Sequence, residues 1–594
     1  MSPSLRWLYR SAFPLSIIGV GLLAGCAIPA GLSAGGGSST PPTPTPFQPL
    51  PAVESAVPGG QPTLTSLSGG SSPTAAMSLT TATPVTSAGG EVGVWVAPYL
   101  PAGLRQALAL PPGFQAVETP QEAALRLEVG DEHALSHWVY ALVVPFPTIS
   151  DGISWEDFRR AWVGESQDPF AGQPILLDEH TLGVLTAWWG APALSAVKVL
   201  PESELLNHAW DHQPSWAIVP FEGLKPRWKV LEIDGQSPLR KEFELTNYHL
   251  AVPISLNGDS ALVETILASG QVEAAANLGL PTSNRDPDRL TVVDLTGVTA
   301  LVRATAFTMR RQGITYPASD IGPILRQADI LHISNEIPFT PDCPAPDPTQ
   351  VGLTFCSDPE YIGLLEEIGT DIVELTGDHF GDWGPEAMRF TLGMYDERGW
   401  PYYGGGYNRQ EARQAQLIEH NGNWLAFIGC NAKGGGYATA SQSQPGAVAC
   451  DYDWMHAEIA RLALEGYQVI ATFQHFEYYS YAPRPDQVHD FRGMAKAWAV
   501  IVSGSQAHQP QGMEFSGDAF IHYGLGNLFF DQWHFCIDNA CDNAFIDRHV
   551  FYNGRHIGTE LVTIVFEDYA RPRPTTAEER ESLLNKVFAA SGWN

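Results

Sequence analysis

The sequence predicts an α/β protein with two folded domains behind an N-terminal extension. Hydrophobic residues make up 44% of its 594 residues and charged residues 16%, a balance typical of globular chains. From about residue 91, short apolar runs alternate with helical patterns. In the second half, polar clusters directly follow Val/Ile/Leu-rich runs, and the loops beyond strand ends are where α/β sheets assemble their sites.

The charge balance is strongly acidic. Asp and Glu number 65 against 33 Lys and Arg, which gives a formal net charge of -32 at pH 7. A nucleic-acid partner is disfavoured, because phosphate backbones are bound by basic surfaces. Docking on an acidic bilayer through charge is disfavoured for the same reason. An apolar run of membrane type occurs only near the N-terminus, which excludes a polytopic membrane protein.

Residues 1–26 resemble a bacterial lipoprotein signal peptide. Arg6 and Arg10 form a basic region, an apolar stretch follows, and the Leu-Ala-Gly-Cys sequence at 23–26 resembles a lipobox. The alternative is an ordinary secretory signal with a chance cysteine. We expect lipidation of Cys26 and an extracytoplasmic protein that acyl chains anchor to a bacterial cell membrane.

Residues 27–90 predict a disordered linker. From residue 31 onward this segment is almost entirely Gly, Ser, Thr, Pro and Ala, and Glu54 is its only charged residue. Such a composition cannot bury enough apolar surface to offset the entropy of ordering the chain.

Six cysteines remain once Cys26 is set aside for lipidation. Their order suggests three local disulfides, which are the ordinary state of cysteines in an exported protein. The expected pairs are Cys343–Cys356, Cys430–Cys450 and Cys536–Cys541. The rival interpretation, a thiolate metal site, is disfavoured because no C-x2-C pair occurs.

Residues 91–285 predict the first α/β domain. We expect strands at 93–100 and 137–147, helices at 119–130 and 153–164, and further apolar elements at 215–224, 228–238 and 247–256. In the second helix, Ser154 precedes Asp157 by three residues, a capping-box arrangement.

The order of these sequence segments resembles that of a type 2 periplasmic-binding-protein domain of the phosphate-binding kind. The resemblance covers most of residues 91–255 and implies an α/β domain of that kind. Ser154, Trp216 and Pro220 either lie near a ligand cleft or cap a helix and pack a core. The Ser/Thr-Gly turns that cradle phosphate in that family are not recognisable here, so no ligand is assigned to this domain.

Residues 286–570 predict the second α/β domain, and a helical tail is expected at 571–594. An opening buried strand lies at 290–301. Later strands are expected to end in polar clusters, at Asn335-Glu336, Asp378-His379, His475 with Glu477, and His508, and the last pair of strands carries Asn527 and Asp531. Carboxylate, amide and imidazole groups suit one or two divalent cations. Paired cations can activate water and hold a leaving oxygen.

The ordered motifs of this domain resemble the CapA family, the poly-γ-glutamate capsule-biosynthesis domain with a calcineurin-like metallophosphatase fold. The family phrases "sNlE", "NNH.fD.G", "HwG.Ey", "GhHpH" and "YglGNf.fd" correspond to Asn335-Glu336, residues 378–384, residues 475–478, residues 504–508 and residues 523–531. The fold class implied is therefore a calcineurin-like α/β sandwich preceded by a periplasmic-binding-protein-like α/β domain.

The same resemblance implies roles for individual residues. It implies metal ligands at Glu336, Asp378, His475 and His508, an oriented general-acid pair of His379 with Asp382, and binding residues Asn335, Glu477, Gln506 and Asn527. The implied cofactor is a divalent metal ion of the Mn, Fe or Mg type.

Three departures from the family pattern bear on activity. Thr296-Gly297-Val298 stands where the family has an opening Gly-Asp, with Asp294 two residues too early. Asp378 replaces an amide ligand by a carboxylate, and Gln506 replaces an imidazole. A carboxylate at position 378 can still bridge two metals, whereas the two losses can instead leave a single weak site or none.

Structural interpretations of these residues stay open at this point. His379 and His475 can be structural histidines at strand ends, and Asp382 can cap the helix that follows it. Asn335 and Asn527 can be turn residues, and Glu477 a solvated charge at the rim. The glycine run at 434–436 resembles no phosphate loop and is interpreted as a turn.

The leading functional hypothesis is a lipid-anchored, metal-dependent hydrolase that acts on or handles an anionic envelope polymer such as poly-γ-glutamate. The alternative is a surface protein that binds a polymer or ligand without catalysis, on a degenerate metallophosphatase fold. A third hypothesis makes the first domain a receptor for a small anion. A serine hydrolase is disfavoured because no G-x-S-x-G elbow occurs.

Overall fold

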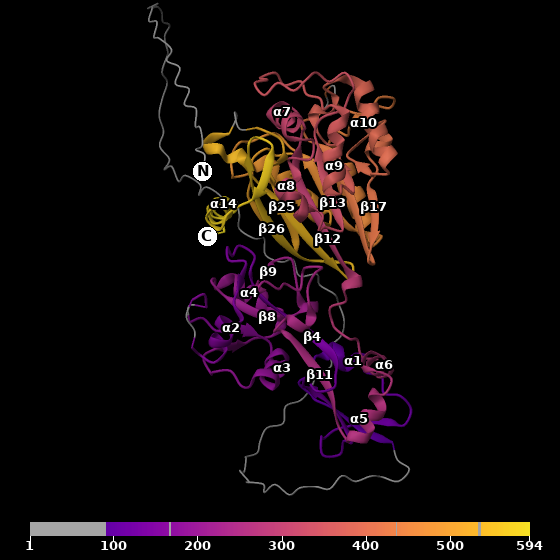
Figure 1. Ribbon diagram of the computed structural model, residues 1–594, viewed down its shortest axis with the longest axis vertical. Coiled ribbons are helices and arrows are strands. Elements are labelled where there is room, and N and C mark those ends of the chain that lie inside the picture. The colour runs from indigo at the N-terminus through magenta and orange to yellow at the C-terminus, as the bar shows by residue number, and fades with distance from the viewer. Residues whose placement is uncertain are drawn as a thin grey trace, which may run out of the picture. The chain divides into compact units, whose positions relative to one another are not determined.

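The computed structural model describes residues 91–165, 168–170, 172–434, 436, 438–532 and 536–593 (Figure 1). All of them belong to one compact unit, Pro46–Asn594. The predicted signal peptide at 1–26 and the predicted linker at 27–90 lie outside the described residues. The described chain alternates helices with parallel and antiparallel strands, which confirms the predicted α/β class.

Residues 91–285, the predicted first domain, form one mixed sheet of nine strands and a separate short strand pair. The strand order is β2-β1-β3-β11-β4-β8-β6-β7, and β9 pairs with β4 beside this path. The strands are β1 (Val92–Val96), β2 (Phe114–Val117), β3 (Leu125–Val129), β4 (Ala134–Pro145), β6 (Ile175–Leu177), β7 (Val197–Val199), β8 (Trp216–Pro220), β9 (Trp228–Val230) and β11 (Ala251–Gly258). A separate short pair joins β5 (Gly152–Ile153) to β10 (Glu232–Ile233). The helices are α1 (Ala102–Ala107), α2 (Trp155–Trp162), α3 (Glu179–Trp189), α4 (Glu202–Asp211), α5 (Ser260–Leu267) and α6 (Gln271–Asn277).

Most of the expected elements of this domain form, with one exception. The helix at 153–164 is confirmed as α2, and the Ser154 side chain caps it by accepting a hydrogen bond from the Asp157 amide. The helix expected at 119–130 is wrong, because Leu125–Val129 is strand β3. This segment lies between β1 and β11, and Leu125 and Leu127 are buried at alternate positions. Pairing on both sides outweighs the helical propensity of the segment.

The residues named for a ligand cleft serve capping and packing. Ser154 is the N-cap of α2. Trp216 is buried, and its ring centroid lies 5.2 Å from that of Phe170. Pro220 ends strand β8. Helix capping, core packing and the end of a strand therefore account for these three residues without a ligand cleft.

The rest of the described chain, which includes the predicted second domain, contains an eight-stranded and a six-stranded sheet. One has the order β15-β14-β13-β12-β25-β26-β27, with β24 beside β12, and the other has the order β17-β18-β20-β21-β23-β22. The strands of the first are β12 (Leu290–Thr299), β13 (Ile330–Asn335), β14 (Ile372–Glu374), β15 (Tyr402–Tyr403), β24 (Asn527–Phe529), β25 (Asn543–Tyr552), β26 (Arg555–Glu567) and β27 (Arg571–Pro574). Those of the second are β17 (Gln416–His420), β18 (Asn423–Asn431), β20 (Gln468–Gln474), β21 (Ala499–Ser503), β22 (Met513–Ser516) and β23 (Ala519–His522).

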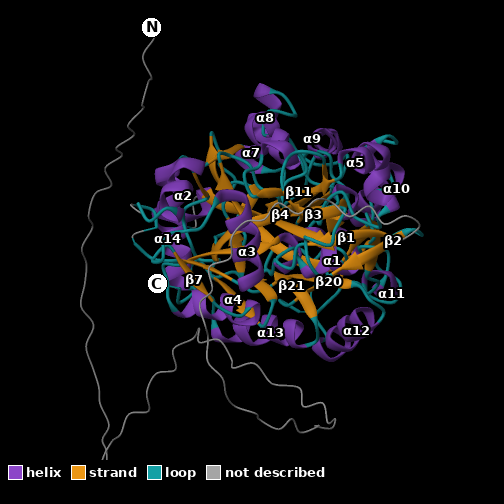
Figure 2. Cartoon of the chain, turned by 90° about the horizontal axis from the view of Figure 1, so that it is seen from below, coloured by secondary structure: helices purple, strands orange, loops and turns teal. Residues whose placement is uncertain are grey.

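These sheets pack face to face through an apolar layer. Leu295 and Ile372 of the first sheet and Phe427, Ile470 and Ile501 of the second belong to one buried cluster. The outer face of the first sheet is covered by α8 (Ala318–Leu325), α9 (Ile362–Ile368) and α10 (Gly384–Arg398). The outer face of the second is covered by α12 (Tyr452–Leu464) and α13 (Pro485–Lys496), which lie outside β20 and β21 in Figure 2. This helix–sheet–sheet–helix order is the α/β sandwich expected from the resemblance.

The opening strand is confirmed as β12, in which every residue is buried. The strands expected to end near Asn335 and His475 are confirmed as β13 and β20. The strand expected to end at Asp378 already ends at Glu374, and Asp378 lies in the short helical turn Asp378–Gly381. The pair of strands around Asn527 is not the last one, because β25, β26 and β27 follow it.

The cysteines agree with expectation, whereas the predicted helical tail begins with strand β27, which pairs with β26. The helix α14 (Ala577–Ala590) lies in the predicted helical tail. Two of the three expected disulfides have S–S lengths of 2.02 and 2.05 Å, for Cys343–Cys356 and Cys430–Cys450. The third pair is Cys536–Cys541. Within the part of the chain that the structure describes, no helix is both long enough and apolar enough to cross a bilayer.

Candidate metal centre

Polar side chains from both sheets of the sandwich meet beyond the carboxyl ends of parallel strands. Glu336 directly follows β13, and Asp378 and His379 follow β14 in the first sheet. Glu477 follows β20 and His508 follows β21 in the second sheet. The five residues are called the Glu336 cluster below. Their ligand atoms form two groups, each with all atoms within 4.8 Å of one another. The groups are Glu336–Glu477–His508 and Glu336–Asp378–His379.

Glu336 is common to both groups. Its side chain is fully buried, and neither carboxylate oxygen has a hydrogen-bond partner among the described residues. Burial raises the pKa of Glu336 above its ordinary value, and the positive charges of His508 and His379 offset this effect only in part. Gly377 allows the close approach of the neighbouring loop, since a Cβ there would lie 2.7 Å from the Glu336 carbonyl oxygen. The carboxylate therefore has ligand capacity that the described protein leaves unused.

Asn527 orients the ring of His508. The His508 Nδ1 donates to the Asn527 Oδ1 at 2.9 Å, and the Asn527 amide donates back to the His508 carbonyl oxygen at 3.2 Å. Because Nδ1 carries the proton, the lone pair of the neutral ring is on Nε2. Nε2 lies 3.9 Å from both Glu336 and Glu477. A histidine fixed in this way presents a metal-binding nitrogen to the cluster.

His379 and Asp382 form the pair that the sequence suggests. The ring Nδ1 lies 2.8 Å from the Asp382 Oδ2, which also accepts the Phe355 amide at 2.7 Å. Burial opposes a charge on the ring, but Asp382, Glu336 and Asp378 raise the pKa of His379 to about 9. Asp382 is not the cap of α10, whose N-cap is Trp383. At neutral pH the metal-free protein therefore holds a proton on His379.

Asp378 is held by two neighbours from the second sheet. Its Oδ1 accepts the Gln474 side-chain amide at 2.7 Å, and its Oδ2 accepts the Lys433 ammonium at 2.8 Å. The Gln474 Oε1 accepts the Asp378 backbone amide at 2.6 Å. Both carboxylate oxygens of Asp378 therefore already have donors in the protein.

Glu477 is a partly buried residue of the cluster rather than a solvated rim charge. Its side chain is 24% exposed and contacts the Lys433 ammonium. The Tyr479 hydroxyl donates to it at 3.2 Å and itself accepts the Gln532 amide at 3.0 Å. Burial would raise the pKa of Glu477, but the charges of His508 and Lys433 lower it to about 2.

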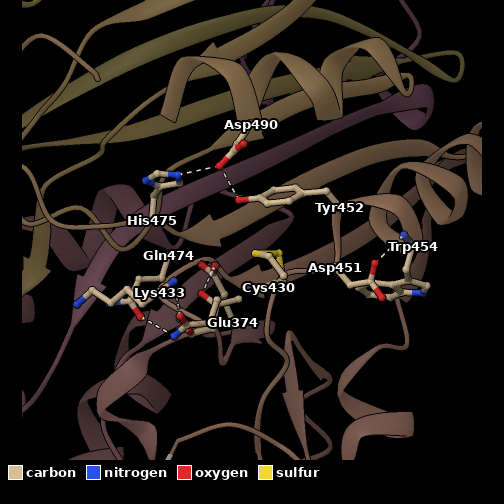
Figure 3. Close-up of a disulfide and its surroundings, with 12 residues drawn as sticks. Glu374, Cys430, Lys433, Asp451, Tyr452, Trp454, Gln474, His475 and Asp490 are labelled. Carbon is tan, nitrogen blue, oxygen red and sulfur yellow. Dashed lines mark hydrogen bonds and ion pairs between the residues drawn. A yellow bond between two sulfur atoms is a disulfide. The ribbon is translucent and has the colours of Figure 1, made fainter. Parts of the chain in front are cut away.

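His475 lies outside both ligand groups. Its Nε2 donates to the Asp490 Oδ2 of α13 at 3.0 Å, and the Tyr452 hydroxyl of α12 donates to the same oxygen at 2.6 Å (Figure 3). Its Nδ1 is buried without a partner among the described residues. A carboxylate-backed histidine with one free nitrogen is a frequent metal-ligand arrangement.

The other residues named from the sequence lie around the cluster and support it. Gln506 donates to the Ser334 hydroxyl at 2.5 Å, and Asn335 donates to the Ile337 carbonyl oxygen and the Tyr395 hydroxyl. Asp294 does not replace the missing opening aspartate, because its buried carboxylate pairs with Arg548 at 2.9 Å.

Three neighbours of the cluster were not named from the sequence. Asn431 ends β18, Lys433 follows two residues later, and Gln474 ends β20. Asn431 donates to the Thr376 carbonyl oxygen at 2.8 Å and to the Gln474 Oε1 at 3.1 Å. They could have been found by the pattern that identified Glu336 and His475, namely a polar residue at or just beyond the end of an apolar strand. The Gly-rich run after Lys433 favoured a turn and concealed it.

This sandwich, with candidate oxygen and nitrogen ligands at its strand ends, has the metallophosphatase-like α/β architecture. Residues 254–532 match the family described as Bacterial capsule synthesis protein PGA_cap. That span contains the whole Glu336 cluster. The resemblance of the second domain to the CapA family is confirmed.

Two curated Bacillus proteins are similar to this chain. "Capsule biosynthesis protein CapA" of Bacillus anthracis is 23% identical over 322 residues, which cover 53% of this chain and 77% of that protein. "PGA biosynthesis protein CapA" of Bacillus subtilis (strain 168) is 26% identical over 232 residues, covering 39% of this chain and 58% of that protein. The chain thus matches little more than half the length of the second relative.

Among solved structures, an ABC-type phosphate transport receptor from Vibrio cholerae is similar over 32% of this chain and 96% of its own. The identity is 11% and the TM-score 0.25. A likeness at this level carries no conclusion about a ligand.

The raised pKa of His379 predicts a pH dependence of stability in the metal-free protein. A histidine whose pKa is about 9 in the folded chain and 6.5 when unperturbed stabilises fully below pH 6.5 and loses this contribution as pH rises toward 9. The contribution lost is about 3 kcal/mol. Thermal unfolding in chelator should show this loss in the wild type and a much smaller loss in Asp382→Asn. The exposed His489→Gln is the control, and parallel profiles for wild type and Asp382→Asn contradict the assignment.

Proposed function

We propose that this chain is a CapA-like envelope protein that binds a divalent cation of the Mn, Fe or Mg type and hydrolyses an anionic polymer such as poly-γ-glutamate. The observation that carries the proposal is the buried Glu336 carboxylate, whose oxygens lack a hydrogen-bond partner among the described residues. Burying a carboxylate that receives no hydrogen bond is costly, and the charges of His508 and His379 offset that cost only in part. A cation beside Glu336 and the His508 Nε2 removes this cost, and such oxygen and nitrogen donors suit these metals.

The chemistry assigned to the cluster divides between cation and protein. A bound cation supplies the positive charge that activates a water molecule and steadies a leaving oxygen or carbonyl. His379 supplies a proton to the leaving atom, because Asp382, which is not a member of either ligand group, hydrogen-bonds the ring at 2.8 Å and favours its protonated form. Asp382 holds the ring through Nδ1, which leaves the second ring nitrogen to face the substrate.

The substrate class rests on the relatives and on charge. Both Bacillus relatives are named for capsule or PGA biosynthesis. The net charge of -32 opposes the approach of a polyanion to the bare protein. A cation at the cluster provides the local positive charge that such a polymer needs, so cation and polymer are expected to bind together.

The proposal places the protein outside the cytoplasm, anchored through a lipidated Cys26. The lipobox-like sequence at 23–26 supports this placement. In a bacterial host, we expect the wild-type chain in the membrane fraction and Cys26→Ser in the soluble extracytoplasmic fraction. Equal membrane retention of both proteins contradicts the lipid anchor.

A second candidate is a surface protein that binds the polymer without cleaving it. The engagement of Asp378 by Gln474 and Lys433 favours this alternative, because it reduces the ligands available to a cation. The third hypothesis, a small-anion receptor in the first domain, meets an electrostatic obstacle. The hollow beside Ser154 in that domain is lined by Asp157 and Glu232, which repel anions.

Metal titration of the chelator-treated full chain tests the cation. We expect Glu336→Gln and His508→Ala to weaken Mn²⁺ binding by at least about 100-fold, because each removes a ligand. We expect a smaller loss for His475→Ala, which lies outside both groups, and no change for the exposed His489→Ala. Calorimetry together with metal analysis checks these affinities. The cation proposal is contradicted if the wild type binds no Mn²⁺, or if Glu336→Gln binds it with wild-type affinity.

Polymer cleavage separates the enzyme from the binding protein. We expect His379→Gln to retain Mn²⁺ and to lower the turnover of poly-γ-glutamate about 100-fold, the usual effect of losing a general acid. Chain length by gel filtration provides the measurement. If the metal-loaded wild type binds the polymer and leaves its length unchanged, the non-catalytic alternative holds.

A further inference from the structure

Lys433 lies between the two ligand groups of the Glu336 cluster. Its ammonium donates to the Asp378 Oδ2 at 2.8 Å and also contacts the Glu477 Oε1. Asp378 belongs to one group and Glu477 to the other. Because both groups share Glu336, they have the outline of a site for two neighbouring cations. Lys433 is therefore the ion-pair partner of one carboxylate in each group.

The position of Lys433 is fixed by its surroundings. Its side chain is only 20% exposed. Its backbone amide donates to the Asn431 Oδ1 at 2.9 Å, and Asn431 in turn is bonded to Thr376 and Gln474. The ammonium is therefore held in the cluster by the protein, in contrast to a long side chain that moves freely in solvent.

The charges of the cluster are unevenly compensated. Asp378 and Glu477 have the Lys433 ammonium as a close partner, and Asp378 also has Gln474. Glu336 has no hydrogen-bond donor among the described residues. A cation therefore gains most beside Glu336 and the His508 Nε2. A second cation beside Asp378 and Glu477 would meet the like charge of the ammonium.

We propose that Lys433 is a built-in counter-charge that takes the place of a second metal ion and restricts the cluster to one divalent cation. The ammonium neutralises Asp378 and Glu477, and Glu336 with His508 is left to hold the single ion. The inference rests on the proposed function in one respect, the binding of that ion. If Lys433 formed only a structural ion pair, removing its charge would create no new cation site, and this distinguishes the two roles.

Metal stoichiometry of the full chain tests this assignment. Chelator-treated wild type, Lys433→Met and Lys433→Arg are titrated with Mn²⁺ by calorimetry and checked by metal analysis. We expect one ion per chain in the wild type and in Lys433→Arg. We expect one additional ion in Lys433→Met, bound at least about tenfold more tightly than any further ion in the wild type. The exposed Lys496→Met is the matched control and should behave like the wild type.

Thermal unfolding supplies a second measurement. In chelator, Lys433→Met should unfold at a lower temperature than the wild type, because Asp378 and Glu477 lose their counter-charge. Mn²⁺ should raise this midpoint more than it raises that of the wild type. Lys433→Gln, which keeps a hydrogen-bond donor, provides the same test if Lys433→Met does not unfold cooperatively.

The outcomes separate this inference from the proposed function. A neutral variant at position 433 that takes up no additional ion overturns the inference, whatever the wild type binds. Two ions in the wild type overturn it as well. A wild type without any ion, alongside Lys433→Met with one, refutes the metal-dependent function of the natural chain and the single-ion count, and retains only the counter-charge role of Lys433.

Discussion

The site depends on the burial of the Glu336 carboxylate, because a buried carboxylate must be compensated by the groups around it. This carboxylate lies where two sheets meet, and neither of its oxygens receives a hydrogen bond from the described residues. Asp378 and His379 reach it from its own sheet, whereas Glu477 and His508 come from the other. These groups are neighbours only because an apolar layer holds the two sheets face to face. The electrostatics of the cluster are thus a consequence of hydrophobic packing some distance away.

The departures from the CapA pattern are each accommodated by a local partner. A carboxylate at position 378 adds a negative charge where the family has an amide, and Lys433 with Gln474 provides the donors for it. Asp294, two residues before the expected position, is committed to Arg548. Gln506 stands where an imidazole is expected and bonds to Ser334. Each change is absorbed by a hydrogen bond or an ion pair, so the sandwich is retained with altered ligand chemistry.

Much of the fold followed from local pattern, and the failures have physical causes. Buried strands such as β12 were predictable because a stretch rich in Val, Leu and Thr has high strand propensity. Leu125–Val129 was misassigned because its pairing with β1 and β11 is non-local. The positions of Glu336 and His508 beyond strand ends were enough to name them as site residues. His475 also follows a strand, but its ring pairs with Asp490 of α13, and a contact between residues of different elements cannot be read from a strand end. Lys433 escaped notice because its role depends on carboxylates from two other strands.

The disulfide Cys430–Cys450 adjoins the segment that carries Asn431 and Lys433 (Figure 3). Two backbone hydrogen bonds reinforce it, from the Asn431 amide to the Val448 carbonyl and from the Cys450 amide to the Asn431 carbonyl. The covalent link and these hydrogen bonds together fix the strand end from which Lys433 extends. In reducing surroundings the same residues would be joined by hydrogen bonds alone, and Lys433 would be held less firmly between its two acidic partners. If Lys433 has the proposed role, this cross-link also helps to set how many ions the charged centre accepts.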